Sequence, residues 1–535
     1  MKRRDFLRAS AAAGGTAALG ASVWTRRAGA VPFGETPSDH QSSMLPASAR
    51  AESILECFLY GGLIPWETFY CVPEFGANDE TWAYTNYPFM VKAAEGCLAP
   101  GEAQGELFTH FAQDSAGRDI FFGPYMKPLL ARPDILARLR IVINRHTLAP
   151  HEAAIPLVAS GRSLGNPSLA GLATHVGRYF VDRDTAGAHP PPFSYGFATG
   201  SNFIPNDGVL SLVAQGLHPG QARPLLVKVD NAARLNTLLA RTTVGDLSER
   251  EQYDALLSLY FEQYQQRLSL GSASEMVRAA KFQELLQASK TVAKTDIIQN
   301  VFLPREIQGQ PTPASLFEAI PGSSCYQVNG PADAPVFSQN PLSAAANIPA
   351  MSLRLATHLL THPEFPARHC TVVDTGLIAA DGGGGYDTHS NGPWRQASNF
   401  NNFLNQLLPR INKPGEGDPN KIDLDKTMVI LNSEFGRAPG RQGTGQGRNH
   451  WPHGFPQIYI GGPIGTAQAG IYGSIQESGM ANTFTTPAEN RIAALLALGI
   501  WPFDAVAYSG SDAQGQTQEG PAARSIIKRI LGHEV

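Results

Sequence analysis

Cys370–Gly376 (CTVVDTG) and Thr427–Asn432 (TMVILN) are the two stretches of the chain that decide its fold. Both are short, continuous apolar runs, which are typical of strands buried on both faces of a parallel sheet. Between them, six large apolar side chains recur at helical spacing: Phe400, Phe403, Leu404, Leu407, Leu408 and Ile411. The order strand, helix, strand predicts an α/β fold in which the two runs are central strands of a mostly parallel sheet, with helices on both faces.

Four further strands are expected elsewhere in the chain: Ser53–Leu63, Leu139–Asn144, the weaker Arg223–Val229, and Phe455–Ile460. The sequence TPAE at 486–489 predicts a helix start, because Thr is a favoured N-cap residue, Pro suits the first helical position and Glu closes a capping box. We therefore expect a single large α/β domain over residues 51–535, with a more charged helical insertion at about 246–346. Residues 31–50 are polar and are expected to form a flexible lead-in.

The composition excludes several classes of protein. The 535 residues are 43% hydrophobic and 16% charged, which is too apolar and too weakly charged for a mainly disordered chain. The formal charge is −4 and no Lys/Arg-rich run occurs apart from the N-terminus, so no nucleic-acid partner is expected. The five cysteines include no C-x-x-C pair, which argues against a zinc knuckle, and their spacing leaves any disulfide pairing open.

Residues 1–30 have the features of an export signal. Arg3 and Arg4 lie in a positively charged start, a weakly apolar stretch follows, and the sequence AGA at 28–30 fits an A-x-A cleavage site. The paired arginines fit the twin-arginine pathway, so we expect the twin-arginine export machinery as a partner and the periplasm, or another place outside the cytoplasm, as the destination. The apolar stretch at 9–24 is too short to span a bilayer, and no transmembrane segment is expected in the mature protein.

Polar clusters follow the two quoted runs, at the place where α/β sheets bind ligands. After the first run come four glycines and then Asp387 and His389, which are two residues apart and therefore face the same side of an extended loop, where they are placed to share a cation. After the second run come Glu434 and Arg437. The plainer alternative is that Arg437 forms an ion pair with Glu434 and that the glycines belong to an ordinary loop.

Three more clusters lie in loops next to predicted strands. A glycine-rich loop at 443–453 ends with His450 and His453, which are either both ligands or one ligand and one supporting residue. The strand Leu139–Asn144 is followed by a polar stretch that includes His151, and the first strand is followed by Gly61-Gly62 and then Glu67. If these strands belong to one sheet, the clusters converge at one edge and form a shared polar site.

The chain resembles the exported bacterial proteins of domain-of-unknown-function family 1501. The resemblance spans roughly residues 50–510, after a matching twin-arginine start. It is carried by the Gly61-Gly62 turn, the His151…Gly161 stretch, Tyr386-Asp387-Thr388-His389, Ser433-Glu434-Phe435-Gly436-Arg437 and Gly447-Arg448-Asn449-His450-Trp451-Pro452. That family is similar to the alkaline phosphatase and sulfatase superfamily. The resemblance therefore implies a three-layer α/β/α, alkaline-phosphatase-like fold with metal ligands at the strand ends.

The chain departs from these family patterns at three places. Family members carry Gly-Gly-x-Ser-His-x-Asp after the first strand, whereas this chain lacks the Ser and the His and has Glu67 in the Asp place. The superfamily's nucleophile stands ten residues before a Gly-Arg like that at 161–162, where this chain has His151. The superfamily's Ser-Asp-His-Gly appears as the sequence SEFG at 433–436, so that Phe435 replaces one histidine ligand.

These residues and the resemblance predict a metal-dependent hydrolase that acts on a phosphate or sulfate ester or a related small anionic substrate. One or two divalent cations are expected, zinc or manganese rather than calcium, because carboxylates and imidazoles are combined. The expected metal ligands are Asp387, His389, Glu434 and His450, with Glu67 as a further ligand and His453 or His151 in supporting positions. The alternative is a non-catalytic exported protein that keeps the fold and uses a degenerate site for binding or assembly.

Three residues are expected to take part in catalysis if the protein is an enzyme: His151, Arg437 and Arg145. Either arginine is suited to hold an oxyanion, because guanidinium groups bind such groups through two parallel hydrogen bonds. His151 is suited to be a metal ligand, a general base or a nucleophile, and the sequence does not choose between these roles.

Overall fold

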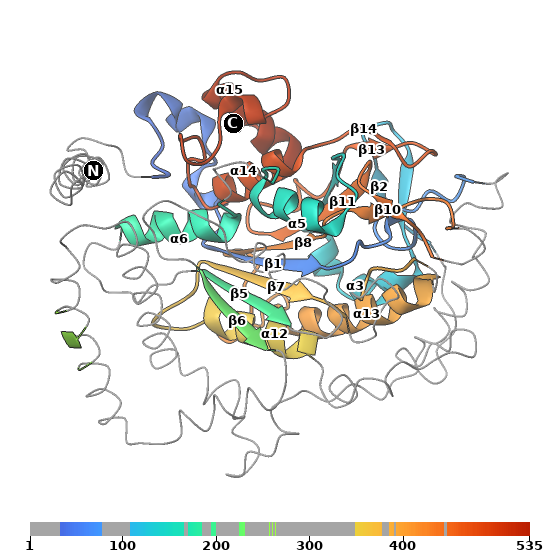
Figure 1. Cartoon of the computed structure of the whole chain (residues 1–535), viewed down its shortest axis with the longest axis horizontal. Helices are drawn as coiled ribbons and strands as arrows, with labels where there is room; N and C mark the ends of the chain where they lie inside the picture. Colours follow the sequence, from blue (N-terminus) through green and yellow to red (C-terminus); the bar gives the residue numbers. More distant parts are fainter. Residues whose placement is uncertain are drawn as a thin grey trace, which may run out of the picture.

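The computed structural model describes residues 33–76, 108–164, 170–183, 194–199, 224–229, 348–376, 385–389, 392–442 and 447–535, together with the helical residues 256, 259, 260 and 263. These ranges form a mixed α/β structure around an eight-stranded sheet with the order β12-β4-β11-β8-β1-β7-β5-β6 (Figure 1). β1 (Ser53–Leu59) lies between β7 (His369–Asp374) and β8 (Thr427–Asn432) and is parallel to both. The sheet is mostly parallel, as predicted, and β11 (Phe455–Gly461) runs antiparallel to both of its neighbours.

The predicted strands are confirmed, with shifts at some ends. β4 (Leu139–Asn144) and β8 have the predicted bounds, and β6 (Leu225–Val229) starts two residues later than expected. β1 ends at Leu59, before Gly61 and Gly62, whose positive φ angles of 112° and 93° turn the chain away from the sheet. α13 (Gly392–Leu407) begins earlier than its apolar pattern, which starts at Phe400, and ends before Leu408 and Ile411, which belong to the short 3-10 helix η10 (Leu408–Arg410) and its C-cap.

The remaining elements have the following bounds. The other strands are β2 (Thr109–Gln113), β3 (Asp119–Phe122), β5 (Ser194–Thr199), β9 (Gly436–Arg437), β10 (His450–Trp451), β12 (Gly470–Tyr472), β13 (Ser474–Ile475) and β14 (Ala481–Thr483). The other helices are α3 (Lys127–Leu130), α4 (Pro133–Leu136), α5 (His151–Ser160), α6 (Leu172–Arg183), α12 (Ile348–Leu360), α14 (Pro487–Ala497) and α15 (Glu519–Ile526).

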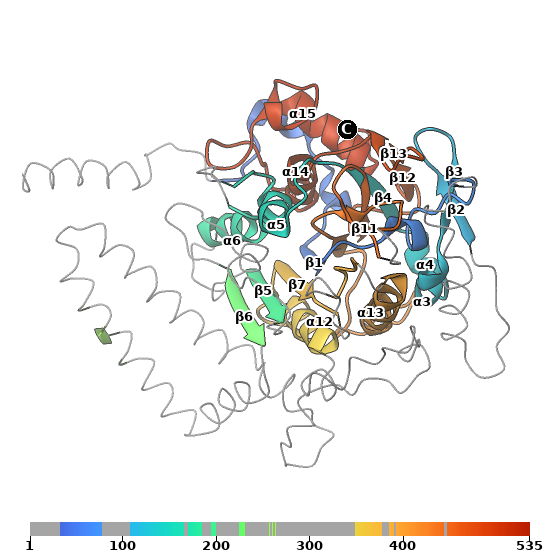
Figure 2. The same cartoon turned by 45° about the vertical axis from the view of Figure 1, so that its right-hand side comes forward.

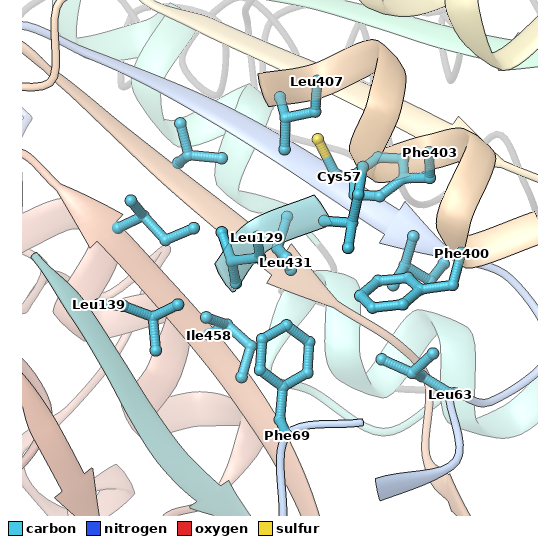
Figure 3. Close-up of a cluster of buried hydrophobic side chains, with 14 of the residues drawn as sticks. Cys57, Leu63, Phe69, Leu129, Leu139, Phe400, Phe403, Leu407, Leu431 and Ile458 are labelled. Carbon is cyan, nitrogen blue, oxygen red and sulfur yellow. The ribbon is translucent and has the colours of Figure 1, made fainter. Parts of the chain in front are cut away.

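Side chains alternate between two packed faces of the sheet, because successive residues of a strand point to opposite sides. On one face, Cys57 of β1 packs in a core with Phe400 and Phe403 of α13, and α12 and α3 cover the same side (Figures 2 and 3). On the other face, Ile54 of β1 packs in a second core with residues of α14, α15 and α6 (Figure 2). Burial on both faces explains why the central strands are continuously apolar in sequence.

A group of buried polar residues interrupts the second core. We call it the α14 cluster, and its members are Glu56, His369, Asn432 and Arg491. An Nη1 atom of Arg491 on α14 lies 2.7 Å from a carboxylate oxygen of Glu56, and Asn432 donates a hydrogen bond of 3.1 Å to the same carboxylate. α14 begins with the predicted capping box, in which Thr486 and Glu489 exchange side-chain and backbone hydrogen bonds. The capping box therefore fixes the start of this helix. The helix places the positively charged guanidinium of Arg491 over the middle of the sheet.

Two of the expected segments lie outside the described residues. They are the signal at 1–30 and almost all of the helical insertion at 246–346. Within the expected lead-in, residues 33–50 form two short 3-10 helices, η1 (Ser38–Ser43) and η2 (Ala47–Ala49), and Leu45 is buried in the second core. Among the described helices, none is both long and apolar enough to cross a membrane. Cys57 and Cys370 form no disulfide, and burial raises the pKa of both thiols well above the usual value.

Candidate metal centre

The carboxyl ends of the central strands bring five segments of the chain together, one of which carries Asp387 and His389 and follows β7 along the chain. β1 leads into Gly61 and Gly62, and β8 leads into Glu434. β4 leads through a loop to His151, the first residue of α5. β10 pairs antiparallel with β9 and places His450 opposite Arg437. The clusters predicted from separate parts of the sequence therefore meet at one edge of the sheet, because parallel strands end on the same side.

Three ligand-type side chains form a compact group: His151, Asp387 and His450. One nitrogen or oxygen atom from each lies within 4.8 Å of those from the others. His151 Nε2 lies 3.2 Å from Asp387 Oδ2, and His450 Nε2 lies 3.5 Å from Asp387 Oδ1. The imidazole rings of His151 and His450 are 4.4 Å apart between centroids and meet edge to face. Two imidazoles thus approach one carboxylate from different sides.

His389 lies beside this group. Its Nε2 is 3.0 Å from Asp387 Oδ1 and 2.9 Å from Nε2 of His450, and its Nδ1 is 2.9 Å from the side-chain oxygen of Gln442. Asp387 and His389 therefore face one side of their loop, as their spacing predicted. Ligand atoms about 2.0–2.1 Å from a tetrahedral zinc ion are separated from one another by about 3.3 Å. The distances between the side-chain atoms of this group are similar to that separation.

Glu434 holds His151 and does not belong to the compact group. Glu434 Oε1 lies 2.6 Å from Nδ1 of His151 and accepts a hydrogen bond of 2.8 Å from the backbone N–H of Gly61. Its Oε2 accepts a hydrogen bond of 3.2 Å from Ser433 Oγ. The side chain is fully buried. Both carboxylate oxygens thus have partners from the protein, and Glu434 acts on the centre through the imidazole of His151.

Arg437 pairs with Asp387 rather than with Glu434, the partner considered in the sequence. Its Nη2 donates to Asp387 Oδ1 and to the carbonyl of Gly61, and its Nη1 donates to the carbonyl of Arg448 at 2.9 Å. Residues 434 and 437 are three apart, so in extended chain they face opposite sides. The guanidinium is fully buried and neutralises part of the negative charge of Asp387.

The charges at this site favour an added positive charge. Burial alone would lower the pKa of His151, but the carboxylates of Asp387 and Glu434, 3.2 Å and 2.6 Å from its two ring nitrogens, outweigh it and raise the pKa to about 9. Burial would raise the pKa of Asp387, yet the three histidines and Arg437 hold it well below its usual range. The hydrogen bond to Asp387 raises the pKa of His389, whereas burial lowers the pKa of His450. Either protons or a metal cation can supply the missing charge.

The residues present fit a divalent transition metal. His151 Nδ1 faces the carboxylate of Glu434, so this nitrogen carries the proton and Nε2 presents its lone pair in the neutral ring. Within the described ranges, Nε2 of His151 is buried and has no hydrogen-bond partner, which is unusual for such an atom. Imidazole nitrogens with a carboxylate oxygen make a donor set that suits zinc or manganese. The side chains of His151, His450 and His389 are 14%, 17% and 29% exposed, so the centre is not sealed.

Two glycines let the first loop approach the centre closely. A Cβ atom on Gly61 would lie 2.2 Å from the backbone nitrogen of Asp387, and a Cβ on Gly62 would lie 3.0 Å from the ring of Phe435. Phe435 stacks on the ring of His450 with centroids 4.5 Å apart. The aromatic ring therefore orients a histidine of the centre by packing.

Three other predicted residues lie in different surroundings. Arg145 donates a hydrogen bond of 3.0 Å to the carbonyl of Ala481 and lies over the ring of Phe484. Glu67 is fully buried and pairs with Arg448 at 3.0 Å, and burial raises its pKa. His453 packs edge to face on Trp451. None of the three belongs to the compact group.

Two further residues brace the centre: Gln396, which the sequence did not indicate, and His146, which belongs to the polar stretch after the predicted strand Leu139–Asn144. Gln396 of α13 accepts a hydrogen bond from the backbone N–H of Ile64 and donates to the carbonyls of Gly62 and Tyr386, so it joins the loop after β1 to the loop that carries Asp387. His146 Nε2 lies 2.7 Å from the backbone carbonyl of Glu434. Gln396 precedes the apolar pattern that predicted this helix, which starts at Phe400, so that pattern gave no indication of it.

One comparison with known proteins gives a match over part of the chain. Residues 369–524 match the model of a family described as a protein of unknown function, DUF1501. The matched part contains Asp387, His389, Glu434 and His450, whereas β1 and His151 precede it. This match supports the family resemblance over that part of the chain. The comparisons with curated proteins and with solved structures give no match.

Proposed function

We propose that this protein is an exported, metal-dependent hydrolase that acts on a phosphate or sulfate ester or a related small anionic substrate. We further propose that its sheet and helices form the three-layer, alkaline-phosphatase-like arrangement that the family resemblance implies. The observation that carries the proposal is the group of His151, Asp387 and His450, whose ligand atoms lie within 4.8 Å of one another at the carboxyl ends of the strands. His389 is the fourth ligand in this proposal, because its Nε2 is 3.0 Å from Asp387.

Each residue of the centre has a stated task in this proposal. A bound divalent cation supplies Lewis acidity toward an ester oxygen and lowers the pKa of water. His151, His389, His450 and Asp387 hold the cation. Arg437 keeps Asp387 ionised and in place, because it donates directly to the Asp387 carboxylate. The partial exposure of His389 and His450 gives a small substrate access from solvent.

Of the three roles considered for His151, the geometry favours that of a ligand. Its Nδ1 lies 2.6 Å from Glu434 and its Nε2 lies 3.2 Å from Asp387, so each nitrogen already faces a carboxylate. A nucleophilic imidazole needs a nitrogen directed at substrate. This observation also favours a second candidate function, a metal-binding protein without hydrolase activity, because His151 stands where the superfamily has its nucleophile.

Metal analysis and ester hydrolysis together test the proposal. The mature protein, purified without chelator, is expected to contain zinc or manganese in a fixed ratio to protein and to hydrolyse p-nitrophenyl phosphate or p-nitrophenyl sulfate. Chelator should abolish hydrolysis and added metal should restore it. Stoichiometric metal without hydrolysis of either ester would favour the second candidate. Folded protein that takes up no metal from supplemented buffer would overturn both.

Export is proposed from the sequence of residues 1–30 and is tested separately. Replacing Arg3 and Arg4 together by lysine should keep the chain in the cytoplasm, because the twin-arginine pathway requires the pair. The measurement is cell fractionation followed by immunoblotting. Unchanged amounts of mature protein outside the cytoplasm would contradict this route.

A further inference from the structure

Glu434 differs from the other acidic residue of the centre in how its oxygens are used. Asp387 has imidazole nitrogens of three histidines around it. Glu434 instead receives hydrogen bonds from the backbone N–H of Gly61 and from Ser433 Oγ, and its Oε1 lies 2.6 Å from His151 Nδ1. A carboxylate with these partners is already satisfied on both oxygens, although its residue type suggested a metal ligand.

The position of the His151 proton follows from this contact. A carboxylate oxygen 2.6 Å from an imidazole nitrogen accepts a hydrogen bond, so Nδ1 carries a proton. In the neutral ring the lone pair then belongs to Nε2, the buried atom that has no hydrogen-bond partner among the described residues and faces Asp387. Metal-binding histidines commonly donate their second ring N–H to a carboxylate in this way, which fixes both the tautomer and the ring orientation.

The backbone around Glu434 fixes the carboxylate itself. The carbonyl of Glu434 is 2.7 Å from His146 Nε2, and the single hydroxyl proton of Ser433 is shared between the carbonyl of Leu59, 2.9 Å away at the end of β1, and the Glu434 carboxylate, 3.2 Å away. Gly61 can donate to Glu434 because its backbone passes against residue 387 with no room for a Cβ. The end of β1 and the end of β8 are thus joined through Glu434.

We propose that Glu434 is a positioning residue, not a metal ligand: it fixes the His151 tautomer and ring so that Nε2 faces the cation. This inference rests on the proposed function, since it assumes that the centre binds a metal. It assigns His151, and not Glu434, to the set of direct ligands. It also predicts that every effect of Glu434 on metal binding passes through the imidazole of His151.

A double-mutant cycle on the mature full-length chain tests this assignment. The probe is Zn²⁺, and its dissociation constant is measured by competition with a chromogenic chelator. Glu434→Ala should weaken Zn²⁺ binding by about 10–100-fold, the usual cost of losing such a partner. In the His151→Ala background the same Glu434→Ala change should have almost no further effect, because the imidazole through which it acts is gone. Equal losses in both backgrounds would make Glu434 a direct ligand and overturn the inference.

The conservative variant Glu434→Gln keeps the test meaningful if Glu434→Ala folds poorly. Its amide oxygen can still accept from Gly61 and His151, and its NH₂ group can donate to Ser433 Oγ, whose lone pairs are available. Zn²⁺ binding by Glu434→Gln should therefore stay within about 10-fold of wild type, and the visible spectrum of the Co²⁺-loaded protein should be retained. A loss as large as that of His151→Ala would overturn the inference. Failure of the wild type to bind Zn²⁺ would instead overturn the proposed function.

Discussion

Two buried charged clusters lie on the same sheet, and they differ in what surrounds their carboxylates. In the α14 cluster, Glu56 faces the guanidinium of Arg491 in the middle of the second core, and both side chains are at most 2% exposed. At the candidate metal centre, three imidazoles surround Asp387, and their side chains are 14–29% exposed. One cluster is closed and its opposite charges are paired. The other is reached by solvent and needs an added positive charge.

The difference teaches how to separate a structural cluster from a candidate site. Burial of charge alone does not separate them, because Glu56, Arg491 and Asp387 are all buried. The separating features are the number of imidazoles gathered around one carboxylate and the access from solvent. His151 has both features, because its Nε2 is one of three imidazole nitrogens beside Asp387 and its side chain is partly exposed. The following four predictions test whether the two clusters are as different as this argument requires.

The largest effect is expected from breaking the α14 ion pair. Arg491→Met leaves the Glu56 carboxylate in the core without its cation, which should lower the free energy of unfolding by about 3–5 kcal/mol. Urea unfolding of metal-free protein measures this loss. The protein that remains folded should bind Zn²⁺ like wild type. As a control, Glu56→Gln combined with Arg491→Met should recover most of the loss, because the uncompensated charge is removed. A double variant as unstable as Arg491→Met would contradict the pairing.

The next largest effect is expected on the pH dependence of the free energy of unfolding. Burial would raise the pKa of Glu56, but Arg491, His369 and Asn432 lower it from 4.5 to about 2. A carboxyl with a lowered pKa in the folded protein stabilises it above pH 4.5, and this stabilisation is lost as the pH falls from 4.5 through 2. The full amount is about 3 kcal/mol. Glu56→Gln should therefore lose less stability than wild type between pH 6 and pH 3 in urea unfolding. Parallel losses in the two proteins would show that this ionisation does not stabilise the fold.

At the metal centre, the main effect should fall on binding and not on folding. His450→Ala removes a ligand and should weaken Zn²⁺ binding by at least about 100-fold, more than the loss of a supporting residue. The free energy of unfolding of the metal-free protein should change by less than about 1 kcal/mol, because the ring is partly exposed. Competition with a chelator and urea unfolding provide the two measurements. His453→Ala is the matched control and should bind Zn²⁺ normally, because His453 lies outside the compact group. Equal losses for both histidines would contradict the assignment.

The smallest effect is expected at the start of α14, which carries Arg491. Thr486→Ala removes the N-cap that accepts from the backbone of Glu489 and should cost about 1 kcal/mol of unfolding free energy. Zn²⁺ binding should not change, because the cap belongs to the helix of the α14 cluster and not to the metal centre. Thr466→Ala, at an exposed loop position, should stay within about 0.5 kcal/mol of wild type in the same thermal or urea assay. A change in metal affinity for Thr486→Ala would couple the two clusters.

The sequence predicted the sheet well because central strands are apolar without a break. It also predicted that Asp387 and His389 face one side of a loop. It further predicted that His450 and Glu434 lie at the same sheet edge, because the ends of parallel strands converge. It could not identify the α14 cluster, because Glu56 and His369 each appear as a single polar residue in or beside an apolar run. Nor could it place Glu434 on His151, because the two are 283 residues apart and their contact depends on the order of the strands.

The choice of partner for Arg437 was also beyond the sequence. Glu434 is its nearest acidic neighbour along the chain, yet the extended conformation directs the two side chains apart, and the turn at Gly61 leaves Asp387 within reach. Distance along the chain was therefore a poor guide to the partner of Arg437. Spacing was informative only where the local conformation was known, as for Asp387 and His389.

Two buried thiols on the α13 side of the sheet, those of Cys57 and Cys370, can report how often the central strands separate. Cys57 and Cys370 are completely buried, and alkylating reagents attack only the thiolate of an accessible cysteine. In a chain whose Cys71, Cys97 and Cys325 are replaced by serine, labelling of Cys57 and Cys370 would wait for the central strands to separate. The labelling half-life would then time how often the middle of the sheet opens under native conditions.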